Sequence, residues 1–258
     1  MGILNTTPDS FSDGGLHLDP GLAVAAGQRM VAEGAAILDI GGESTRPGAA
    51  PTPPEEERRR ILPVIRALAG AGVPLSVDTR NAGTMAAALD AGASIINDVS
   101  ALSHDPRALP LVAARGCAVV LMHMRGTPAT MGAHAAYGDA AADVLAELAA
   151  RVAVAESAGV ARDRIAVDPG IGFAKSFRDN AGVLRALATF RALGCPILVG
   201  VSRKGFVGQL SGVPDPAERL AGSIAAGLFA AAHGADILRV HDVAATVQAL
   251  RVWQGLAG

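Results

Sequence analysis

The chain has 258 residues, of which 50% are hydrophobic and only 3% are aromatic. This length agrees with the ~250 residues of one α/β barrel and is short for two average domains. The 24 acidic and 22 basic residues leave a net charge of −2, and the basic residues are scattered along the chain. The composition therefore excludes the strongly basic pattern of a nucleic-acid-binding protein.

The first residues and the apolar runs predict a cytoplasmic protein. The start, MGILNTTPDS, lacks the basic segment of a secretory signal. The longest apolar runs are broken by Gly, His or Arg before they reach the ~18 residues of a membrane span. The two cysteines, Cys117 and Cys195, have no CxxC partner and form no disulfide framework. We expect Cys117 to be a small buried side chain.

Short apolar runs alternate with longer helical patterns along the whole chain. The expected strands are Gly2–Asn5, Ala36–Ile40, Leu75–Asp78, Ser94–Asn97, Ala118–Met122, Ile165–Asp168, Ile197–Gly200 and Ile237–Val240. The expected helices lie near 19–34, 54–70, 81–91, 106–115, 139–159, 179–193, 216–233 and 242–254. Many helices end at a glycine, and Asp-Pro pairs at 19–20, 105–106 and 215–216 predict helix starts. The run EEERRR, residues 55–60, is expected to be a solvated helix face with ion pairs.

This alternation predicts a parallel sheet covered by helices. No linker or change in composition divides the chain, so we expect one domain over residues 1–258. Eight repeated units favour an α/β fold that closes into a single (β/α)8 TIM barrel. A doubly wound open sheet is the alternative, but the loop after the first strand lacks the GxGxxG pattern that this fold would need for a dinucleotide.

Polar clusters follow almost every expected strand, whereas the loops at the opposite ends are plain. Barrels of this type bind ligands on the loops that follow the strands. No HExxH, CxxC or Ser-His-Asp pattern is present. Several carboxylates and amides with one lysine suit a flat heterocycle, because a carboxylate accepts two parallel hydrogen bonds from an N–H/NH2 edge. Arg46, Arg239 and His241 suit a phosphate or diphosphate. Asp98 could either cap the next helix or touch a ligand.

The loops read GILNTTPDSFSDGG, DIGGESTRPGA, VDTR, INDVS, LMHMRG, VDPGIGFAK, VSRKGF and LRVHDV. In this order and at these spacings they resemble the dihydropteroate synthases over nearly the whole chain. One departure is Ala174, which stands where the family usually has glycine. The resemblance implies a TIM barrel that condenses a 6-hydroxymethyl-7,8-dihydropterin diphosphate with p-aminobenzoate in folate biosynthesis, releasing diphosphate with help from Mg2+.

Carried over residue by residue, the resemblance implies three groups of site residues. The pterin and diphosphate side would use Thr45, Asp78, Asn97, Met124 (or Met122), Asp168, Lys204, Arg239 and His241. The p-aminobenzoate side would use Phe11, Thr45, Pro47, Phe173, Ser202 and Lys204. Asn5 would be the direct protein ligand of Mg2+. Catalysis would involve Asp13, Arg46, Lys204, Arg239 and His241, with Thr6–Gly15 and Glu43–Ala49 as loops that close over the site.

The implied mechanism is dissociative: diphosphate leaves first, and the aniline nitrogen then attacks a pterin-methylene cation. No protein nucleophile is needed, which agrees with the absence of a nucleophile motif. The family also implies a homodimer formed through helices late in the barrel. Two alternatives stay open, a pterin-binding methyltransferase that acts on methyltetrahydrofolate and a catalytically silent paralogue that only binds pterin or a partner.

Overall fold

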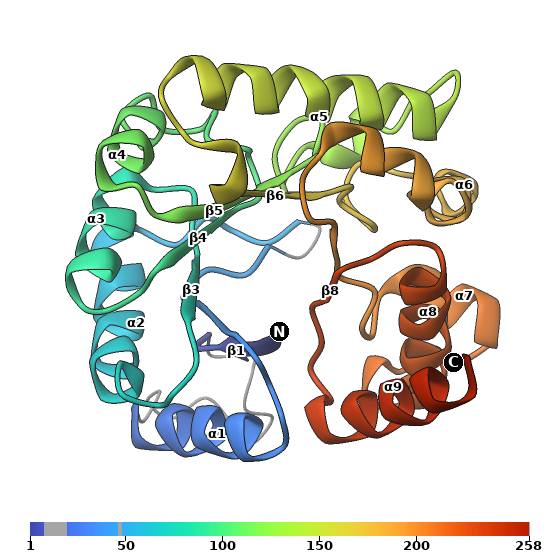
Figure 1. The fold of residues 1–258 in the computed structure, drawn as a ribbon, viewed down its shortest axis with the longest axis horizontal. Coiled ribbons are helices and arrows are strands. Elements are labelled where there is room, and N and C mark those ends of the chain that lie inside the picture. The colour runs from blue at the N-terminus through green and yellow to red at the C-terminus, as the bar shows by residue number, and fades with distance from the viewer. Residues whose placement is uncertain (8–19, 46–47, 258) are drawn as a thin grey trace.

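The structure is a computed structural model that describes residues 1–7, 20–45 and 48–257. Its strands form a central ring with the helices outside it (Figure 1). The strands are β1 Gly2–Asn5, β2 Leu38–Gly41, β3 Leu75–Asp78, β4 Ile95–Asp98, β5 Ala118–Met122, β6 Ile165–Asp168, β7 Leu198–Val199 and β8 Ile237–Leu238. All eight begin within two residues of the expected positions.

Two parallel sheets join to close the ring. Strands β1 to β6 pair in chain order, and β7 pairs with β8. The parallel bridge Val167–Ile197 links β6 to the start of β7, and the bridge Gly2–Val240 links β1 to the residues after β8. At this second junction the Ile3 amide donates to the Val240 carbonyl at 2.9 Å. The closed order confirms the TIM barrel and excludes the doubly wound sheet.

The helices cover the outside of the ring. They are α1 Pro20–Ala32, α2 Pro54–Leu68, α3 Ala82–Asp90, α4 Ala108–Arg115, α5 Ala140–Ser157, α6 Phe177–Arg185, α7 Gly205–Ser211, α8 Leu220–Ala232 and α9 Val243–Ala257. Short 3-10 segments lie at Met131–His134, Arg162–Arg164, Leu187–Leu193 and Pro216–Glu218. In the part of the chain that is described, no helix combines the length and hydropathy required to cross a bilayer.

The expected helix 179–193 is wrong as a single element. It divides into α6 and the 3-10 segment Leu187–Leu193. A 3-10 helix has three residues per turn, so positions three apart share one face. Leu187, Phe190 and Leu193 have this spacing, and all three are buried. Packing of this stripe against the core therefore overrides the helix propensity of an Ala- and Leu-rich run.

Two helix starts also differ from expectation. Helix α4 begins at Ala108 rather than at 106, and α8 begins at Leu220, because Asp215 caps the separate 3-10 turn Pro216–Glu218. The short helix α7 was not expected at all, since its sequence GFVGQLS contains two glycines and a serine. Burial of Phe206 and Val207 stabilises it in spite of this composition.

The run 55–60 is only partly a solvated face. Glu55 and Glu56 pair with Arg58, Arg59 and Arg60 as expected. Glu57, however, is fully buried and accepts hydrogen bonds from Asn81 at 2.9 Å and Thr84 at 2.7 Å. Glu57 lies on the inner face of α2, so the prediction that residues 55–60 form a solvated face is wrong at this residue.

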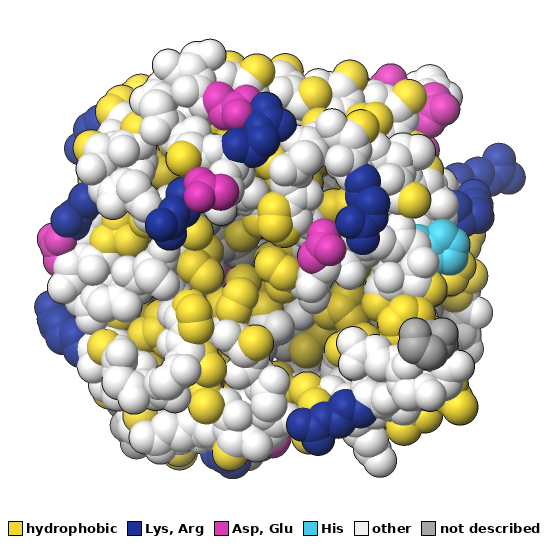
Figure 2. All heavy atoms as spheres, in the orientation of Figure 1, with side chains coloured by type: hydrophobic (Ala, Val, Ile, Leu, Met, Phe, Trp, Pro, Cys, Tyr) yellow, Lys and Arg dark blue, Asp and Glu magenta, His cyan; other side chains and the backbone are white. Residues whose placement is uncertain are grey.

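Buried aliphatic side chains fill the space between the ring and the helices. Cys117 and Cys195 are buried in this core as free thiols, as expected for Cys117. Figure 2 shows one face of the molecule, on which hydrophobic side chains gather around a hollow near the centre. Basic and acidic side chains are interspersed around the edge of this face, without a continuous basic stripe.

Candidate active site

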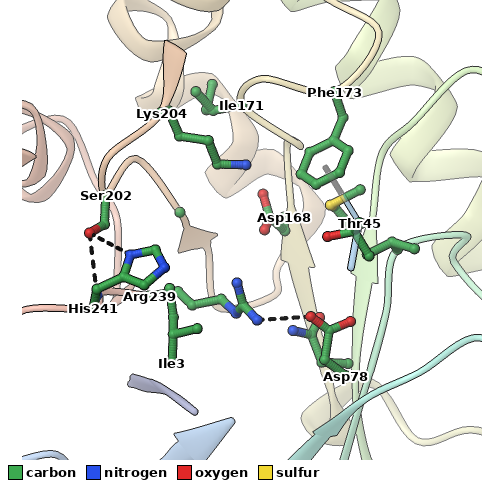
Figure 3. A pocket seen from close by; sticks show the side chains of 14 residues that line it. Ile3, Thr45, Asp78, Asp168, Ile171, Phe173, Ser202, Lys204, Arg239 and His241 are labelled. Carbon is green, nitrogen blue, oxygen red and sulfur yellow. Dashed lines mark hydrogen bonds and ion pairs between the residues drawn. The ribbon is translucent and has the colours of Figure 1, made fainter. Parts of the chain in front are cut away.

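A cavity lies where the strands end and their polar loops begin (Figure 3). The sequence-predicted residues that line it are Thr45, Asp78, Asn97, Asp168, Phe173, Ser202, Lys204, Arg239 and His241. The remaining lining residues are Ile3, Val99, Met122, Ile171 and Gly200. The barrel thus brings together side chains from one rim that lie as far apart in the sequence as Thr45 and His241.

A network of charged groups crosses the bottom of this cavity. Arg239, just after β8, donates from Nε to Asp39 Oδ2 at 2.6 Å and from Nη2 to Asp78 Oδ2 at 2.8 Å. Asn97 Nδ2 donates to the same Asp39 oxygen at 3.0 Å. One guanidinium therefore bridges carboxylates from β2 and β3, and the network fixes the Asp78 and Asn97 side chains relative to each other.

Burial shifts the proton affinities in this network. It raises the pKa of Asp78 to about 7, and although the Arg239 guanidinium opposes the shift, the nearby Asp39 carboxylate adds to it. Burial disfavours the charged form of Arg239, but Asp39 and Asp78 outweigh that effect and raise its pKa further. Arg239 therefore stays a cation.

Asp168 ends β6 and faces the middle of the cavity. Its Oδ1 accepts a hydrogen bond from the Gly170 amide at 2.7 Å, which orients the carboxylate. Burial raises the pKa of Asp168, while this amide and the Lys204 ammonium act in the opposite direction. A buried carboxylate held in this way is suited to accept hydrogen bonds from an N–H/NH2 edge.

Lys204 extends into the cavity toward Phe173 and Asp168 (Figure 3). Its Nζ lies 4.1 Å from the centre of the Phe173 ring. A Cβ on Gly172 would lie 3.1 Å from Lys204 Cδ, and Gly172 has a φ of +84°, so glycine lets the lysine stem pass against the backbone. Burial lowers the pKa of Lys204 to about 8, with Asp168 opposing the shift. The ammonium is thus held between an aromatic face and a carboxylate.

His241 and Ser202 form the side of the cavity nearest β7 and β8. Ser202 Oγ lies 3.0 Å from His241 Nδ1 and also accepts from the His241 amide at 3.2 Å. Burial, with Arg203 and Arg239 nearby, lowers the pKa of His241 to about 4. Arg203 forms an ion pair with Asp242 at 2.6 Å, so the role of Asp242 is structural. A neutral His241 can donate one hydrogen bond to an anion.

Asn5 ends β1 beside Gly41 and Asp78. A Cβ built on Gly41 would lie 3.6 Å from Asn5 Oδ1 and 3.8 Å from Asp78 Oδ2, so both oxygens border the same point of the rim. Mg2+ prefers oxygen ligands and is often held by few protein groups plus phosphate oxygens. Among the described residues, no cluster of three His, Cys, Asp or Glu could hold a metal by itself. Asn5 Oδ1 has the chemistry of one such oxygen ligand.

Several predicted residues lie elsewhere or beyond the described residues. Met124 does not line the cavity; Met122 does, and Met124 packs against the cluster that contains Met122 and Phe173. Asp98 points away from the cavity and accepts from Ser100 and Leu102, so it stabilises the turn after β4. The candidates outside the described residues are Phe11, Asp13, Arg46 and Pro47.

Sequence reasoning gave no site role to Asp39, which holds both Arg239 and Asn97. Its side chain is fully buried, and Oδ1 has no hydrogen-bond partner among the described residues. The sequence feature that could have indicated a role for Asp39 is its position as the one carboxylate inside the apolar run AAILDIGG. A charged group inside a buried strand is costly unless it is paired, so this position predicts a partner even when the partner is unknown.

Taken together, the cavity presents a double acceptor, amide and carboxylate groups, an ammonium over an aromatic ring, and a cation near a neutral histidine. The first three features suit a flat heterocycle and an aromatic amine, and the fourth, Arg239 near His241, suits an anionic leaving group. Ser202 and His241 are in contact, but among the described residues no carboxylate forms a hydrogen bond with His241, so the triad of a serine hydrolase is incomplete here. The arrangement suits a reaction driven by positioning and electrostatics.

Known proteins are similar to this chain over nearly its full length. A model of the pterin-binding enzyme family matches residues 1–241. The dihydropteroate synthase of Escherichia coli K12 is 47% identical over 253 residues, covering 98% of this chain and 89% of that protein. The Xanthomonas albilineans dihydropteroate synthase solved with 4-aminobenzoic acid is 52% identical, with a TM-score of 0.94 and coverage of 100% and 92%.

A second Xanthomonas albilineans structure, in complex with 7,8-dihydropteroate, is 49% identical with a TM-score of 0.90 and the same coverage. The dihydropteroate synthase of Mycobacterium leprae is 49% identical over 258 residues, covering 98% of this chain and 91% of that protein. These matches extend over nearly the whole chain in both sequence and fold. The chain therefore belongs to the dihydropteroate synthase family of pterin-binding enzymes.

Proposed function

We propose that this enzyme condenses 6-hydroxymethyl-7,8-dihydropterin diphosphate with p-aminobenzoate to give 7,8-dihydropteroate and diphosphate, in folate biosynthesis. The observation that carries the proposal is the cavity in which Asp168, Asn97 and Lys204 converge. The complexes of relatives with 4-aminobenzoic acid and with 7,8-dihydropteroate support the same pair of substrates.

The pterin occupies the floor of the cavity in this proposal. Asp168 accepts hydrogen bonds from the N–H/NH2 edge, and Asn97 and Asp78 meet the opposite ring atoms. Met122 provides an apolar wall in place of the expected Met124. The Lys204 ammonium donates to the carbonyl oxygen and ring nitrogen. The heterocycle is recognised by paired donors and acceptors, which gives selectivity because any mismatch leaves a buried polar group unpaired.

The p-aminobenzoate ring packs above the pterin, against Phe173 and near Ser202 and Thr45. Phe11 and Pro47, from the two loops, complete this side in the proposal. The carboxylate of the substrate lies toward Ser202, and its amine faces the pterin methylene carbon. Lys204 contacts both halves because it reaches across the cavity beside Phe173. Positioning two reactants in this way removes much of the entropic barrier to their reaction.

Asn5 holds a Mg2+ ion in this proposal, together with oxygens of the diphosphate. When bound, the ion supplies positive charge to the leaving group. Asn5→Ala should impair turnover much more than it impairs binding of a pterin that lacks the diphosphate. Calorimetric titration with that pterin and steady-state rates over a range of Mg2+ concentrations provide the two measurements. Equal losses in both would remove Asn5 from the metal role.

The reaction is dissociative in this proposal. Arg239 and His241 stabilise the departing diphosphate, and Arg46 assists them. Asp13 stabilises the positive charge that develops on the pterin methylene. The aniline nitrogen then attacks this carbon and loses a proton. Slow cleavage of the pterin diphosphate in the absence of p-aminobenzoate is the expected sign of this order, and its complete absence would favour a concerted displacement.

The experiment that tests the function measures diphosphate release with and without p-aminobenzoate, while mass spectrometry detects 7,8-dihydropteroate. We expect release to depend strongly on the aromatic amine. Methyl transfer from methyltetrahydrofolate with no condensation would instead indicate the methyltransferase. Tight pterin binding without either reaction would indicate a silent paralogue. Both alternatives contradict the proposal.

We also propose that the enzyme acts in the cytoplasm as a homodimer. Helices α7, α8 and α9 lie together on one side of the barrel (Figure 1). Large exposed apolar side chains occur on all three, namely Leu210, Leu220, Phe229, Val252 and Leu256. An exposed apolar surface on neighbouring helices favours association of two copies. It is the surface expected from the family resemblance.

A further inference from the structure

Lysine is rare in this chain, and both of its lysines lie at the same end of the barrel. The 22 basic residues comprise 20 arginines and two lysines, Lys175 and Lys204. Lys204 belongs to the cavity described above. Lys175 lies in the loop between β6 and α6 and does not line the cavity. Its contacts nevertheless connect it to the cavity wall.

The Lys175 ammonium is surrounded by four acceptors, three of them close. Nζ lies 2.9 Å from His123 Nδ1, 3.0 Å from the Phe173 carbonyl and 3.1 Å from the Gly170 carbonyl, and the His123 carbonyl is more distant at 3.5 Å. An ammonium has three N–H donors and no acceptor, so its donors match the three close acceptors. A guanidinium is planar and could not converge on three acceptors from one atom. The geometry therefore requires lysine at a position where the rest of the chain would use arginine.

These contacts also determine the state of His123. While Lys175 is an ammonium it can only donate, so His123 Nδ1 accepts and the ring proton resides on Nε2. That nitrogen lies 2.9 Å from Glu147 Oε2 on α5. Glu147 in turn accepts from Arg125 Nε at 2.9 Å. Burial and the Lys175 charge lower the pKa of His123 to about 4. A neutral histidine thus links Lys175 to an ion pair near the surface.

The loop that Lys175 holds has a conformation that needs external support. Gly170 has a φ of +67°, and a Cβ there would lie 1.9 Å from the His123 carbonyl oxygen. Ala174 has a φ of +46°, in the left-handed region that side chains disfavour. Such residues persist when surrounding contacts enforce them. The Lys175 hydrogen bonds fix the carbonyls of Gly170 and Phe173, which lie along the backbone between these two positive-φ residues.

Phe173 connects this loop to the cavity. Its ring lines the cavity and lies 4.1 Å from Lys204 Nζ. Its amide donates to the Gly170 carbonyl at 3.0 Å, and its carbonyl accepts from Lys175. Both backbone polar groups of Phe173 are therefore held within this loop. A shift of the loop would move the ring away from Lys204 and widen the cavity at this wall.

We propose that Lys175 is a positioning residue: its three hydrogen bonds fix the β6–α6 loop so that the Phe173 ring forms the wall against which the aromatic amine packs. The role of that wall rests on the proposed function. Lys175 touches neither substrate and acts through Phe173. His123 and Glu147 support it from the outer side, so the affinity for the aromatic amine depends on groups well behind the cavity wall.

A double-mutant cycle tests this proposal in the full-length enzyme. Lys175→Met should raise the KM for p-aminobenzoate roughly tenfold, the usual scale for losing well-aligned charged hydrogen bonds. The KM for the pterin substrate and kcat should change by less than about threefold. Phe173→Leu should also raise the KM for p-aminobenzoate. Since Lys175 acts through Phe173, the double variant should be little worse than Phe173→Leu alone. Additive losses would overturn the proposal.

The matched control is Arg178→Met. Arg178 is exposed on α6, three residues further on, and no hydrogen bond or ion pair involves it among the described residues. This variant removes the same charge near the same loop, and its KM values should match those of the wild type. Assays run at about pH 6 keep Lys175 an ammonium, because burial lowers its pKa to about 7.

A substrate-free measurement separates this proposal from the proposed function. The 15N resonances of His123 should show the Nε2–H form in the wild type and should change in Lys175→Met. Amide hydrogen exchange over residues 170–176 should become faster in that variant and stay slow in Arg178→Met. Unchanged His123 signals and unchanged exchange would overturn the positioning role, whatever reaction the enzyme catalyses. An inactive wild type with the expected spectra would contradict only the proposed function.

If Lys175→Met does not fold, Glu147→Ala provides a milder variant. Glu147 is half-buried, so its removal disturbs the core less while it frees His123. The KM for p-aminobenzoate should then rise by about two- to fivefold, a change typical of losing one partly exposed contact, with the pterin KM unaffected. An unchanged KM in the folded variant would contradict the proposal.

Discussion

At the scale of single residues, the site depends on buried charges that are held by few partners. Asp39, Asp78 and Arg239 form one group, and Asp168 relies on a backbone amide and the nearby Lys204. Removing one partner from a buried pair is more costly than the pair itself is stabilising. Substitutions at these positions must therefore be compared with matched changes at exposed positions.

Asp168→Asn should weaken pterin binding by at least ~tenfold, because one of two acceptor oxygens becomes an NH2 group that faces a donor. The Gly170 amide can still donate to the remaining oxygen, so the loop should stay folded. Calorimetry with a pterin lacking the diphosphate measures the loss. Asp163→Asn, an exposed position before β6, is the control. Unchanged affinity would dispose of the Asp168 assignment.

His123 should make the protein less stable in acid. Burial and Lys175 lower its pKa to about 4, whereas an unfolded histidine titrates near ~6.5. Between these values the unfolded chain binds a proton that the folded protein does not. The contribution is therefore fully present above pH ~6.5 and is lost progressively as the pH falls toward ~4, by up to ~3 kcal/mol.

Urea unfolding of the wild type and of His123→Gln at several pH values between these limits checks this sign. The variant should lose less stability on acidification than the wild type does. His104→Gln, at an exposed position after β4, should follow the wild-type curve. Parallel curves for the wild type and His123→Gln would show that His123 is not the acid-sensitive group.

At the scale of elements, the β6–α6 loop is a constrained part of the rim. Its Ala174 occupies a left-handed conformation, and the resemblance to the dihydropteroate synthases implies that glycine is usual at this position. Ala174→Gly should therefore stabilise the protein by about 1 kcal/mol. In a protein of this size, that corresponds to a rise in Tm of about 2–4 °C.

The same substitution inside a regular helix should have the opposite effect. Ala149 is exposed in the middle of α5, and Ala149→Gly should cost about 1 kcal/mol. Thermal unfolding of both variants, followed by circular dichroism, gives the comparison. A lower Tm for Ala174→Gly would mean that contacts of the Ala174 methyl group outweigh its backbone strain.

At the scale of the whole molecule, the exposed apolar side chains of α7, α8 and α9 should mediate the proposed dimer. Leu210→Asp combined with Val252→Asp should shift the protein from dimer to monomer, because each change places a charge in an apolar contact. Light scattering after size-exclusion chromatography measures the mass. Val154→Asp, on α5 away from these helices (Figure 1), should leave the dimer intact. A monomeric mass for the wild-type protein would contradict the proposal that the enzyme is a homodimer.

Local sequence patterns predicted most of the elements, because period and capping are local properties. Four strands, β1, β3, β5 and β6, have the expected bounds. The errors arose where packing opposed propensity, as in the 3-10 segment Leu187–Leu193 and in the glycine-containing helix α7. The burial of Glu57 could not be predicted locally either, because its hydrogen-bond partners lie on another element: Asn81 precedes α3 and Thr84 lies within it.

Motifs of contiguous residues were enough to predict the alternation of strands and helices, the rim on which the polar loops gather, and the family. Which of those polar groups contact one another depends on how the strands pack. Arg239 pairs with Asp39 from 200 residues away, because the residues after β8 close against β1, and β1 pairs with β2, which carries Asp39. Likewise, Lys175 finds its acceptor on His123 across neighbouring strands. Such contacts depend on the distances between packed strands, which no local pattern of residues encodes.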